Sequence, residues 1–156
     1  MLIEVVSNSA NLKHHLERAR LVRNSVRLFM THNTEYITPD EQVQWYSGLD
    51  HDKLRLFVYY IAGTRVCAGY GIINTSETEF PLLTGAILEH HQGYGHGRVL
   101  FSKLIDISLK DYYHRPELDV LESNEKAIKL YKSLGFTEIE RVDGVIFMAY
   151  TGPRER

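Results

Sequence analysis

Apolar and polar residues alternate along this chain with two different periods, and the periods separate helices from strands. Apolar residues recur every three or four positions over residues 12–30, which predicts an amphipathic helix with a break near Arg23 and Asn24. The same spacing predicts helices over residues 99–113 and 124–134. Thr38, Pro39 and Glu41 form a helix start with a capping box. The short helix that follows is predicted to bury Val43, Trp45, Tyr46 and Leu49.

Segments rich in β-branched and aromatic residues predict the strands, which cover residues 2–7, 54–61, 65–73, 80–88, 118–121, 136–142 and 145–150. Asp143-Gly144 between the last two strands is a strong hairpin signal. The predicted order is β-α-α-β-β-β-α-β-α-β-β, which indicates an α/β fold with helices covering a mixed sheet. No repeat or linker divides the chain, so a single domain over residues 1–156 is expected.

Composition narrows the class of protein further. The 156 residues are 44% hydrophobic and 24% charged, as in globular domains, and the net charge of −2 argues against a dedicated nucleic-acid binder. No apolar run is long enough to cross a membrane, and no basic segment precedes an apolar one at the start, so a cytoplasmic location is expected. A single cysteine, Cys67, allows no intrachain disulfide and is expected to be a small buried residue.

One stretch departs from this balance, because five cations fall within fifteen residues: Lys13, Arg18, Arg20, Arg23 and Arg27. A solvated basic helix face is the favoured interpretation. A surface that attracts an anionic substrate is the alternative.

A glycine-rich segment, Gln92-Gly93-Tyr94-Gly95-His96-Gly97, lies between a predicted strand and a predicted helix. Backbone N–H groups at a helix N-terminus lack intrahelical partners and favour anions, so this segment is a candidate phosphate site. The spacing differs from G-x-G-x-x-G, and the Gly-Lys-Ser/Thr of a Walker A loop is absent. A glycine-rich turn without a ligand is the alternative.

This segment resembles the cofactor loop of the GCN5-related N-acetyltransferase (GNAT) superfamily, Gln/Arg-x-x-Gly-x-Gly/Ala. Residues 124–136 also resemble that family's segment N-x-x-A-x-x-L-Y-x-x-x-G-F, through Asn124, Ala127, Leu130, Tyr131 and the pair Gly135-Phe136. The element order agrees over nearly the whole chain. The resemblance implies direct transfer of an acetyl or other acyl group from acetyl-CoA, as co-substrate, to a primary amine.

The resemblance also implies where acetyl-CoA binds. The diphosphate lies on the glycine loop, the pantetheine arm runs beside the preceding strand, and a backbone N–H at a bulge near Ile87 polarises the thioester carbonyl. The implied cofactor-binding residues are Ile87, Leu88, Gln92, Gly93, Tyr94, Gly95, His96, Gly97, Arg98 and Asn124. Asn124 is also expected to cap the helix that follows it.

Candidate catalytic residues lie within the second of these segments and immediately before the first. Tyr131 matches the family tyrosine that protonates the CoA sulfur, and the alternative is a role in the apolar helix face alone. Glu89 and His90, next to His91, are candidates for the base, with a water molecule as the alternative. A zinc site formed by His90, His91 and His96 is disfavoured, so no metal is expected.

Residues near the N-terminus suggest which amine accepts the acyl group. Residues 23–49 are similar to N-terminal regions of GNAT enzymes that acetylate amino-sugar nucleotides, which implies that Arg23 or Arg27 meets a phosphate and that Trp45 borders the acceptor pocket. A protein N-terminus or lysine, a polyamine, an aminoglycoside and a modified base remain alternatives, as does a non-catalytic acyl-CoA sensor. A homodimer through an exposed edge of the strand at residues 145–150 is also considered.

Overall fold

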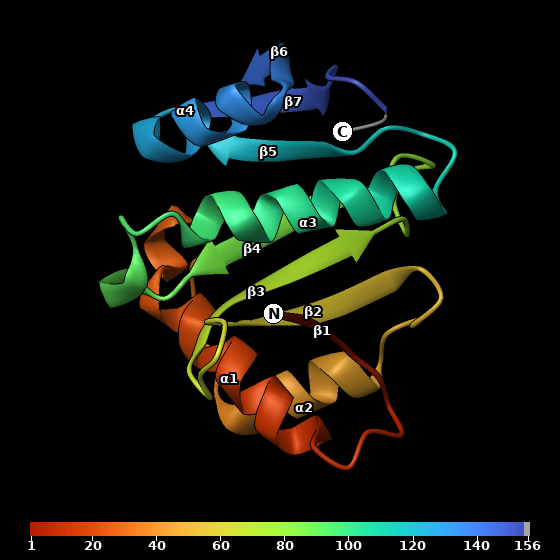
Figure 1. Cartoon of the computed structure of the whole chain (residues 1–156), viewed down its shortest axis with the longest axis vertical. Helices are drawn as coiled ribbons and strands as arrows, with labels where there is room; N and C mark the ends of the chain where they lie inside the picture. Colours follow the sequence, from red (N-terminus) through yellow and green to blue (C-terminus); the bar gives the residue numbers. More distant parts are fainter. Residues whose placement is uncertain (155–156) are drawn as a thin grey trace.

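A computed structural model describes residues 1–154 and places four α-helices against one seven-stranded sheet (Figure 1). The helices are α1 (Leu12–Ser25), α2 (Pro39–Ser47), α3 (His96–Asp111) and α4 (Glu125–Leu134), with short 3-10 helices η1 (Arg27–Phe29) and η2 (Glu89–His91). The strands are β1 (Leu2–Val5), β2 (Leu54–Tyr60), β3 (Cys67–Asn74), β4 (Leu82–Ile87), β5 (Glu117–Leu121), β6 (Phe136–Val142) and β7 (Val145–Tyr150). The predicted α/β class and element order are confirmed.

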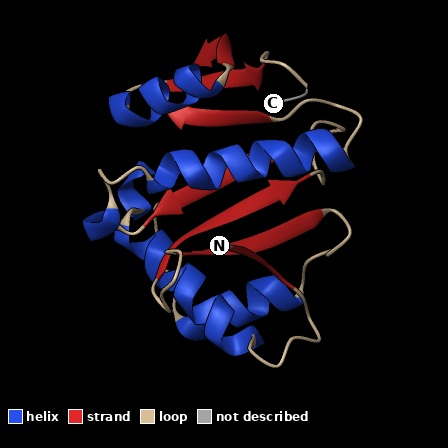
Figure 2. Ribbon diagram, viewed as in Figure 1, coloured by secondary structure: helices blue, strands red, loops and turns tan. Residues whose placement is uncertain are grey.

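The sheet has the order β1-β2-β3-β4-β5-β7-β6, and every neighbouring pair is antiparallel except β4 and β5. The sheet has two parts, which meet where β4 lies beside β5 (Figure 2). One part contains β1 to β4, and the other contains β5, β7 and β6. The strand β7 lies inside the sheet, between β5 and β6. The expectation that its edge is free for a dimer contact is therefore wrong, and the edge strands are β1 and β6.

Each face of the sheet has its own hydrophobic core. One core lies beneath α3 and contains Leu100, Phe101 and Leu104 together with Tyr131 of α4. The other lies beneath α1 and α2 and contains Leu16 and other apolar residues of that side. Strand residues alternate between the two cores because successive side chains point to opposite faces of a sheet.

The break in the first long helix is confirmed at a slightly later position, because α1 runs through Arg23 and ends at Ser25, before η1. In α2 the capping box of Thr38 and Glu41 is present as predicted. The predicted buried face of α2 is partly wrong: Gln42 and Tyr46 are buried, whereas Val43 and Trp45 are exposed. The polar side chain of Gln42 can be buried on this face because its amide donates a hydrogen bond to the carbonyl of Leu16 at 3.4 Å.

Residues with positive φ form the turn between β6 and β7 and the C-terminal cap of α4. Asp143 and Gly144 have φ values of 49° and 79°, as the predicted hairpin turn requires. Gly135 ends α4 with a φ of 113°, as expected for a left-handed cap. Cys67 is buried, and its thiol donates to the carbonyl of Gly69 at 3.4 Å.

Candidate functional site

The strands β4 and β5 diverge immediately after they meet. Leu82 and Glu117 form the register pair of these two strands, and beyond that pair a cavity of about 1110 Å³ opens between them. Leu83 and Ile87 of β4 face the core beneath α3, whereas Thr84 and Ala86 point to the opposite face, and all four line the cavity. The cavity therefore connects the two faces of the sheet.

The cavity edge of β4 carries unpaired backbone groups. Leu88 N–H donates to the carbonyl of Ala68 on β3 at 2.7 Å. Because hydrogen-bonded and non-hydrogen-bonded residues alternate in an antiparallel pair, the N–H groups of Ile87 and Gly85 point away from β3, toward the cavity. The register with β3 is regular from Leu82 to Ile87. The expected bulge near Ile87 is therefore wrong, and the divergence of β5 exposes this edge instead.

Gln92 fixes the end of this strand. Its side-chain amide Nε2 donates to the carbonyl of Ile87 at 3.0 Å. The first residue of the glycine-rich segment is thus attached to the strand, and the segment begins directly above the opening between β4 and β5.

The glycine-rich segment presents a row of free backbone donors. Among residues 1–154, no backbone N–H from Gly93 to Arg98 has a hydrogen-bond partner, and Gly95 caps α3 without a side-chain contact. Gly93 and Gly95 have φ values of 87° and 85°, and a Cβ atom at either position would meet nothing within 4 Å. The donors therefore surround open space at the positive end of α3, which fits a diphosphate.

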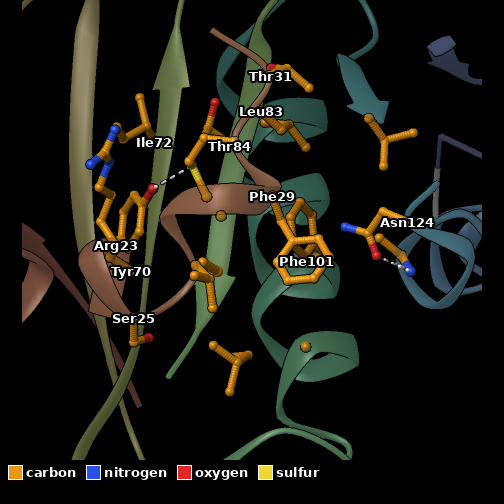
Figure 3. Close-up of a pocket in the computed structure, with 18 of the residues that line it drawn as sticks. Arg23, Ser25, Phe29, Thr31, Tyr70, Ile72, Leu83, Thr84, Phe101 and Asn124 are labelled. Atoms are coloured by element: carbon orange, nitrogen blue, oxygen red, sulfur yellow. Dashed lines mark hydrogen bonds between the residues drawn. The ribbon is translucent and has the colours of Figure 1, made fainter. Parts of the chain in front are cut away.

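The start of α4 forms the opposite wall of the cavity. Asn124 caps α4 through its Oδ1, which accepts from Ala127 N–H at 3.4 Å. The Asn124 side chain lies on the far side of Phe101 from Arg23 and Tyr70 (Figure 3). Arg98 of α3 is held to α4 by a 2.6 Å hydrogen bond to Ser133 Oγ.

Tyr131 lies at the boundary between core and cavity. Its ring packs edge-on against Phe101 at a centroid distance of 4.9 Å, and its side chain is 8% exposed. Burial, followed by the nearby Asp119 carboxylate, raises the pKa of the Tyr131 phenol well above its ordinary value. The phenol therefore keeps its proton throughout the neutral range.

Asp119 of β5 is a cavity residue that was not predicted from the sequence. Leu118 and Val120 on either side of it belong to the core beneath α3, so Asp119 projects to the opposite face, toward α1. A lone carboxylate between two core residues of a central strand was the available signal, since such a residue needs a polar partner or a cavity.

Residues 30–33, here called the strap, cross the cavity and hold Asp119. Thr31 Oγ1 donates to Asp119 Oδ1 at 2.6 Å, and His32 Nε2 lies 2.8 Å from Oδ2. The strap thus connects the segment after α1 with a strand far along the chain, and it covers the α1 side of the opening.

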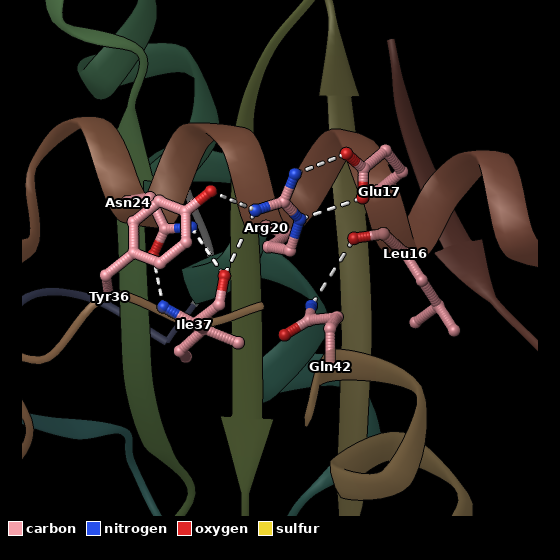
Figure 4. Close-up of polar contacts among 7 residues, drawn as sticks. All are labelled: Leu16, Glu17, Arg20, Asn24, Tyr36, Ile37 and Gln42. Atoms are coloured by element: carbon pink, nitrogen blue, oxygen red, sulfur yellow. Dashed lines mark hydrogen bonds and ion pairs between the residues drawn. The ribbon is translucent and has the colours of Figure 1, made fainter. Parts of the chain in front are cut away.

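The segment that follows the strap is attached to α1 by side-chain contacts with the backbone (Figure 4). Asn24 accepts from Ile37 N–H at 3.0 Å and donates to the Ile37 carbonyl at 2.9 Å, and Arg20 donates to the same carbonyl at 3.0 Å. Asn24, Ile37, Thr38 and Glu41, which belong to the region compared with amino-sugar-nucleotide acetyltransferases, therefore have structural roles in this attachment and in the α2 cap.

The basic stretch does not form one surface. Arg20 and Arg23 are buried, and Arg20 pairs with Glu17. Arg23 donates to the carbonyls of Asn33 and Glu35, so the favoured interpretation of a solvated basic face is wrong for these two arginines.

The histidines near the glycine-rich segment do not converge. His90 and His91 lie in η2 with ring centroids 4.4 Å apart, while His96 Nδ1 lies 2.9 Å from the Tyr59 hydroxyl on β2. Among the described residues, no group of three or more His, Cys, Asp or Glu side chains is arranged to hold a metal ion.

A model of the acetyltransferase (GNAT) family matches residues 20–136 of this chain, a span that includes both the glycine-rich segment and Tyr131. The chain belongs to the GNAT family of acetyltransferases. This family consists of enzymes that use acyl-CoA, so the resemblance and the acyl-CoA co-substrate expected from it are confirmed at the family level.

Solved structures support the GNAT fold over almost the whole chain. Ribosomal-protein-alanine N-acetyltransferase from Brucella melitensis has a TM-score of 0.75 at 17% identity, with 96% of this chain and 98% of that chain covered. A putative acetyltransferase from Salmonella typhimurium, solved with acetyl-CoA, has a TM-score of 0.74 at 21% identity and coverages of 95% and 92%. A variant of spermidine N-acetyltransferase from Vibrio cholerae has a TM-score of 0.75 at 20% identity and coverages of 96% and 93%. No curated protein matches the sequence.

The predicted site residues of this GNAT protein divide into two groups. The cavity is lined by Tyr131, Glu89, Ile87, Gln92, Gly93, Gly95, Gly97, Arg98, Asn124, Arg23 and Trp45. Leu88, Tyr94, His90, His96 and Arg27 lie outside that lining, and Arg27 donates to the Thr34 carbonyl at 2.8 Å. Within the described residues, no helix has the length and apolar composition needed to span a bilayer.

Proposed function

We propose that this GNAT protein transfers an acetyl group from acetyl-CoA to the primary amine of a small molecule. The row of free N–H groups from Gly93 to Arg98 is the observation that carries the proposal, because open glycine positions at a helix N-terminus fit a diphosphate. When bound, acetyl-CoA supplies a thioester whose C–S bond breaks as the new C–N bond forms. The protein's own backbone and side chains stabilise the developing charge and transfer the protons.

The backbone edge of β4 supplies electrophilic stabilisation. The Ile87 N–H points into the opening between β4 and β5 without a partner on β3. Such a donor stabilises negative charge that develops on a carbonyl oxygen, an effect of roughly 3 kcal/mol for a preorganised donor.

Proton transfer is divided between the two faces of the sheet. An alkylamine has a pKa near 10.4, so it arrives as an ammonium and must lose a proton before it attacks. Asp119 projects from the α1 face and is the proposed acceptor for this proton, directly or through water, with Glu89, another carboxylate that lines the cavity, as the alternative. Tyr131, on the α3 side, holds the proton for the thiolate that leaves.

The acceptor is proposed to enter from the α1 face. Trp45, Tyr70 and Ile72 line this part of the cavity, and the strap covers it. Amino-sugar nucleotides remain candidate acceptors together with other small amines, and a protein N-terminus or lysine is the alternative.

Two measurements test the proposal. Acetyl-CoA should raise the melting temperature of the wild-type protein, and the absence of any shift at saturating acetyl-CoA would remove the co-substrate assignment. CoA release should then be followed with a panel of amines that begins with amino-sugar nucleotides. Binding of acetyl-CoA without turnover on any amine would favour the non-catalytic sensor.

A further inference from the structure

Arg23 carries a charge into the acceptor side of the cavity. Its side chain is 8% exposed and lines the cavity. Its guanidinium Nη1 donates to Asn24 Oδ1 at 3.3 Å and to the Glu35 carbonyl, and Nη2 donates to the Asn33 carbonyl. All three acceptors are neutral oxygens, so these contacts hold the loop without neutralising the charge.

No carboxylate among residues 1–154 forms an ion pair with Arg23. Burial lowers the pKa of its guanidinium, nearby Tyr70 partly opposes this shift, and the Arg27 charge adds a smaller lowering. The group remains a cation at physiological pH. A buried charge without a counter-charge is costly, and a ligand anion would offset that cost.

Arg23 also retains hydrogen-bond donors for such an anion. A guanidinium has five N–H groups, of which three are used, so the Nε–H and one Nη2–H remain. Within the described residues, every side-chain nitrogen that is inaccessible to solvent has a hydrogen-bond partner. Because the Nε of Arg23 has no partner, it is accessible to solvent. Nε and Nη2 together form a planar fork that binds carboxylate or phosphate through two hydrogen bonds.

The strap fixes the position of Arg23 relative to Asp119. Asn33 contacts Arg23, and Thr31 contacts Asp119. Two residues of extended chain span at most about 7 Å, so the strap holds Arg23 and Asp119 through neighbouring positions, and both side chains line the same cavity. Tyr70 and Ile72 supply apolar surface to the cavity wall on this face.

We propose that the acceptor is a small amine that also carries an anionic group, a carboxylate or a phosphate, which binds the free fork of Arg23 while the amine faces Asp119. This inference rests on the proposed acetyl transfer to a small amine. It selects zwitterionic amines, such as amino acids or amino-sugar phosphates, over polyamines, whose second ammonium group Arg23 would repel.

Equilibrium binding with matched amine pairs tests this inference without requiring turnover. Calorimetry in the presence of CoA would compare L-phenylalanine with 2-phenylethylamine, L-leucine with 3-methylbutylamine, and glucosamine 1-phosphate with glucosamine. In at least one pair the anionic member should bind about tenfold or more tightly, since charge-assisted bidentate contacts are the strong ones. The first two pairs test a carboxylate, and the third tests a phosphate.

Variants assign the preference to Arg23. Arg23→Gln should bring the two members of the preferred pair to within about twofold. Arg18→Gln, which removes an exposed cation of α1 outside the cavity lining, should leave the preference unchanged. Arg23→Lys, which keeps the charge but removes the fork, is the second variant if Arg23→Gln does not fold. The proposal is overturned if no anionic member binds, if the members without an anionic group bind as tightly, or if the preference survives in the Arg23 variants.

Turnover separates this inference from the proposed function. If an anionic amine binds through Arg23 but releases no CoA, acetyl transfer is refuted and the anion site stands. If CoA is released only with amines that lack an anionic group, acetyl transfer stands and the role of Arg23 in substrate choice is refuted.

Discussion

Thr31 Oγ1 donates a 2.6 Å hydrogen bond to the Asp119 carboxylate, although 88 positions separate the two residues in the chain. This contact joins the segment after α1 to β5, across the opening that β4 and β5 leave between them. The proposed proton acceptor is therefore held by the same segment that covers the acceptor side of the cavity. Acceptor binding and proton transfer are expected to depend on each other through the strap.

Asp119→Asn should lower kcat about 10²-fold or more, because the amide keeps the size of the side chain but cannot take a proton. Acetyl-CoA binding should be unchanged, since the carboxylate lies away from the glycine-rich segment. Steady-state kinetics and a thermal shift with acetyl-CoA measure the two effects. Glu122→Gln is the control, because Glu122 is a half-exposed carboxylate that pairs with Arg141. A wild-type kcat in Asp119→Asn would move the proton acceptor to Glu89 or to water.

Gly95→Glu should abolish the thermal shift caused by acetyl-CoA. The new side chain would enter the open space in front of the free N–H groups, add a negative charge there and oppose the left-handed backbone. Gly63→Glu is a matched control, because Gly63 has a φ of 75° and open space around it but lies in the β2–β3 turn. An equal loss of the shift in both variants would point to destabilisation instead of lost binding.

Tyr131→Phe should lower kcat about 10²-fold while leaving acetyl-CoA binding intact, since the ring still packs against Phe101. Tyr150→Phe is the control, because Tyr150 is a buried tyrosine whose hydroxyl donates to the Pro153 carbonyl away from the cavity. Equal activity of wild type and Tyr131→Phe would leave Tyr131 with a packing role alone.

The pH profile gives a second test of Tyr131. Burial raises the pKa of its phenol, so the proton is present at neutral pH and is lost only above the ordinary value of about 10. Wild-type activity should therefore show no alkaline decline from this group between pH 7 and pH 10. A decline with a midpoint near pH 8 that Tyr131→Phe lacks would contradict this assignment.

Asn24→Ala should destabilise the protein by about 1–3 kcal/mol, because Ile37 N–H loses its partner and the Ile37 carbonyl loses one of two donors. Urea unfolding measures the change. Asn33→Ala is the control: it removes an exposed contact to Glu35 N–H but keeps the Asn33 carbonyl that Arg23 binds, so a smaller change is expected. A loss in Asn24→Ala no larger than in the control would show that Ile37 is held mainly by Arg20.

Local physical chemistry explains why most elements were predictable. Thr38 and Glu41 cap α2 through contacts with near neighbours, Gly135 adopts a conformation that most residues avoid, and Asp143-Gly144 suits a tight hairpin turn. The glycine-rich segment belongs to the same class, since a free helix N-terminus is a local property. The α2 face was less predictable, because Gln42 is buried through a contact with α1 that its own helix does not encode.

The sequence by itself determined the helices, the strands, their order, and a loop suited to phosphate, because each depends on residues close together in the chain. The tertiary structure alone decided that β7 is interior, that Gln42 is buried, that Arg23 holds a loop, and that Asp119 meets Thr31. Those facts depend on the divergence of β4 and β5 and on contacts between distant segments. Such contacts follow from how the layers pack, which a periodic pattern of apolar residues does not specify.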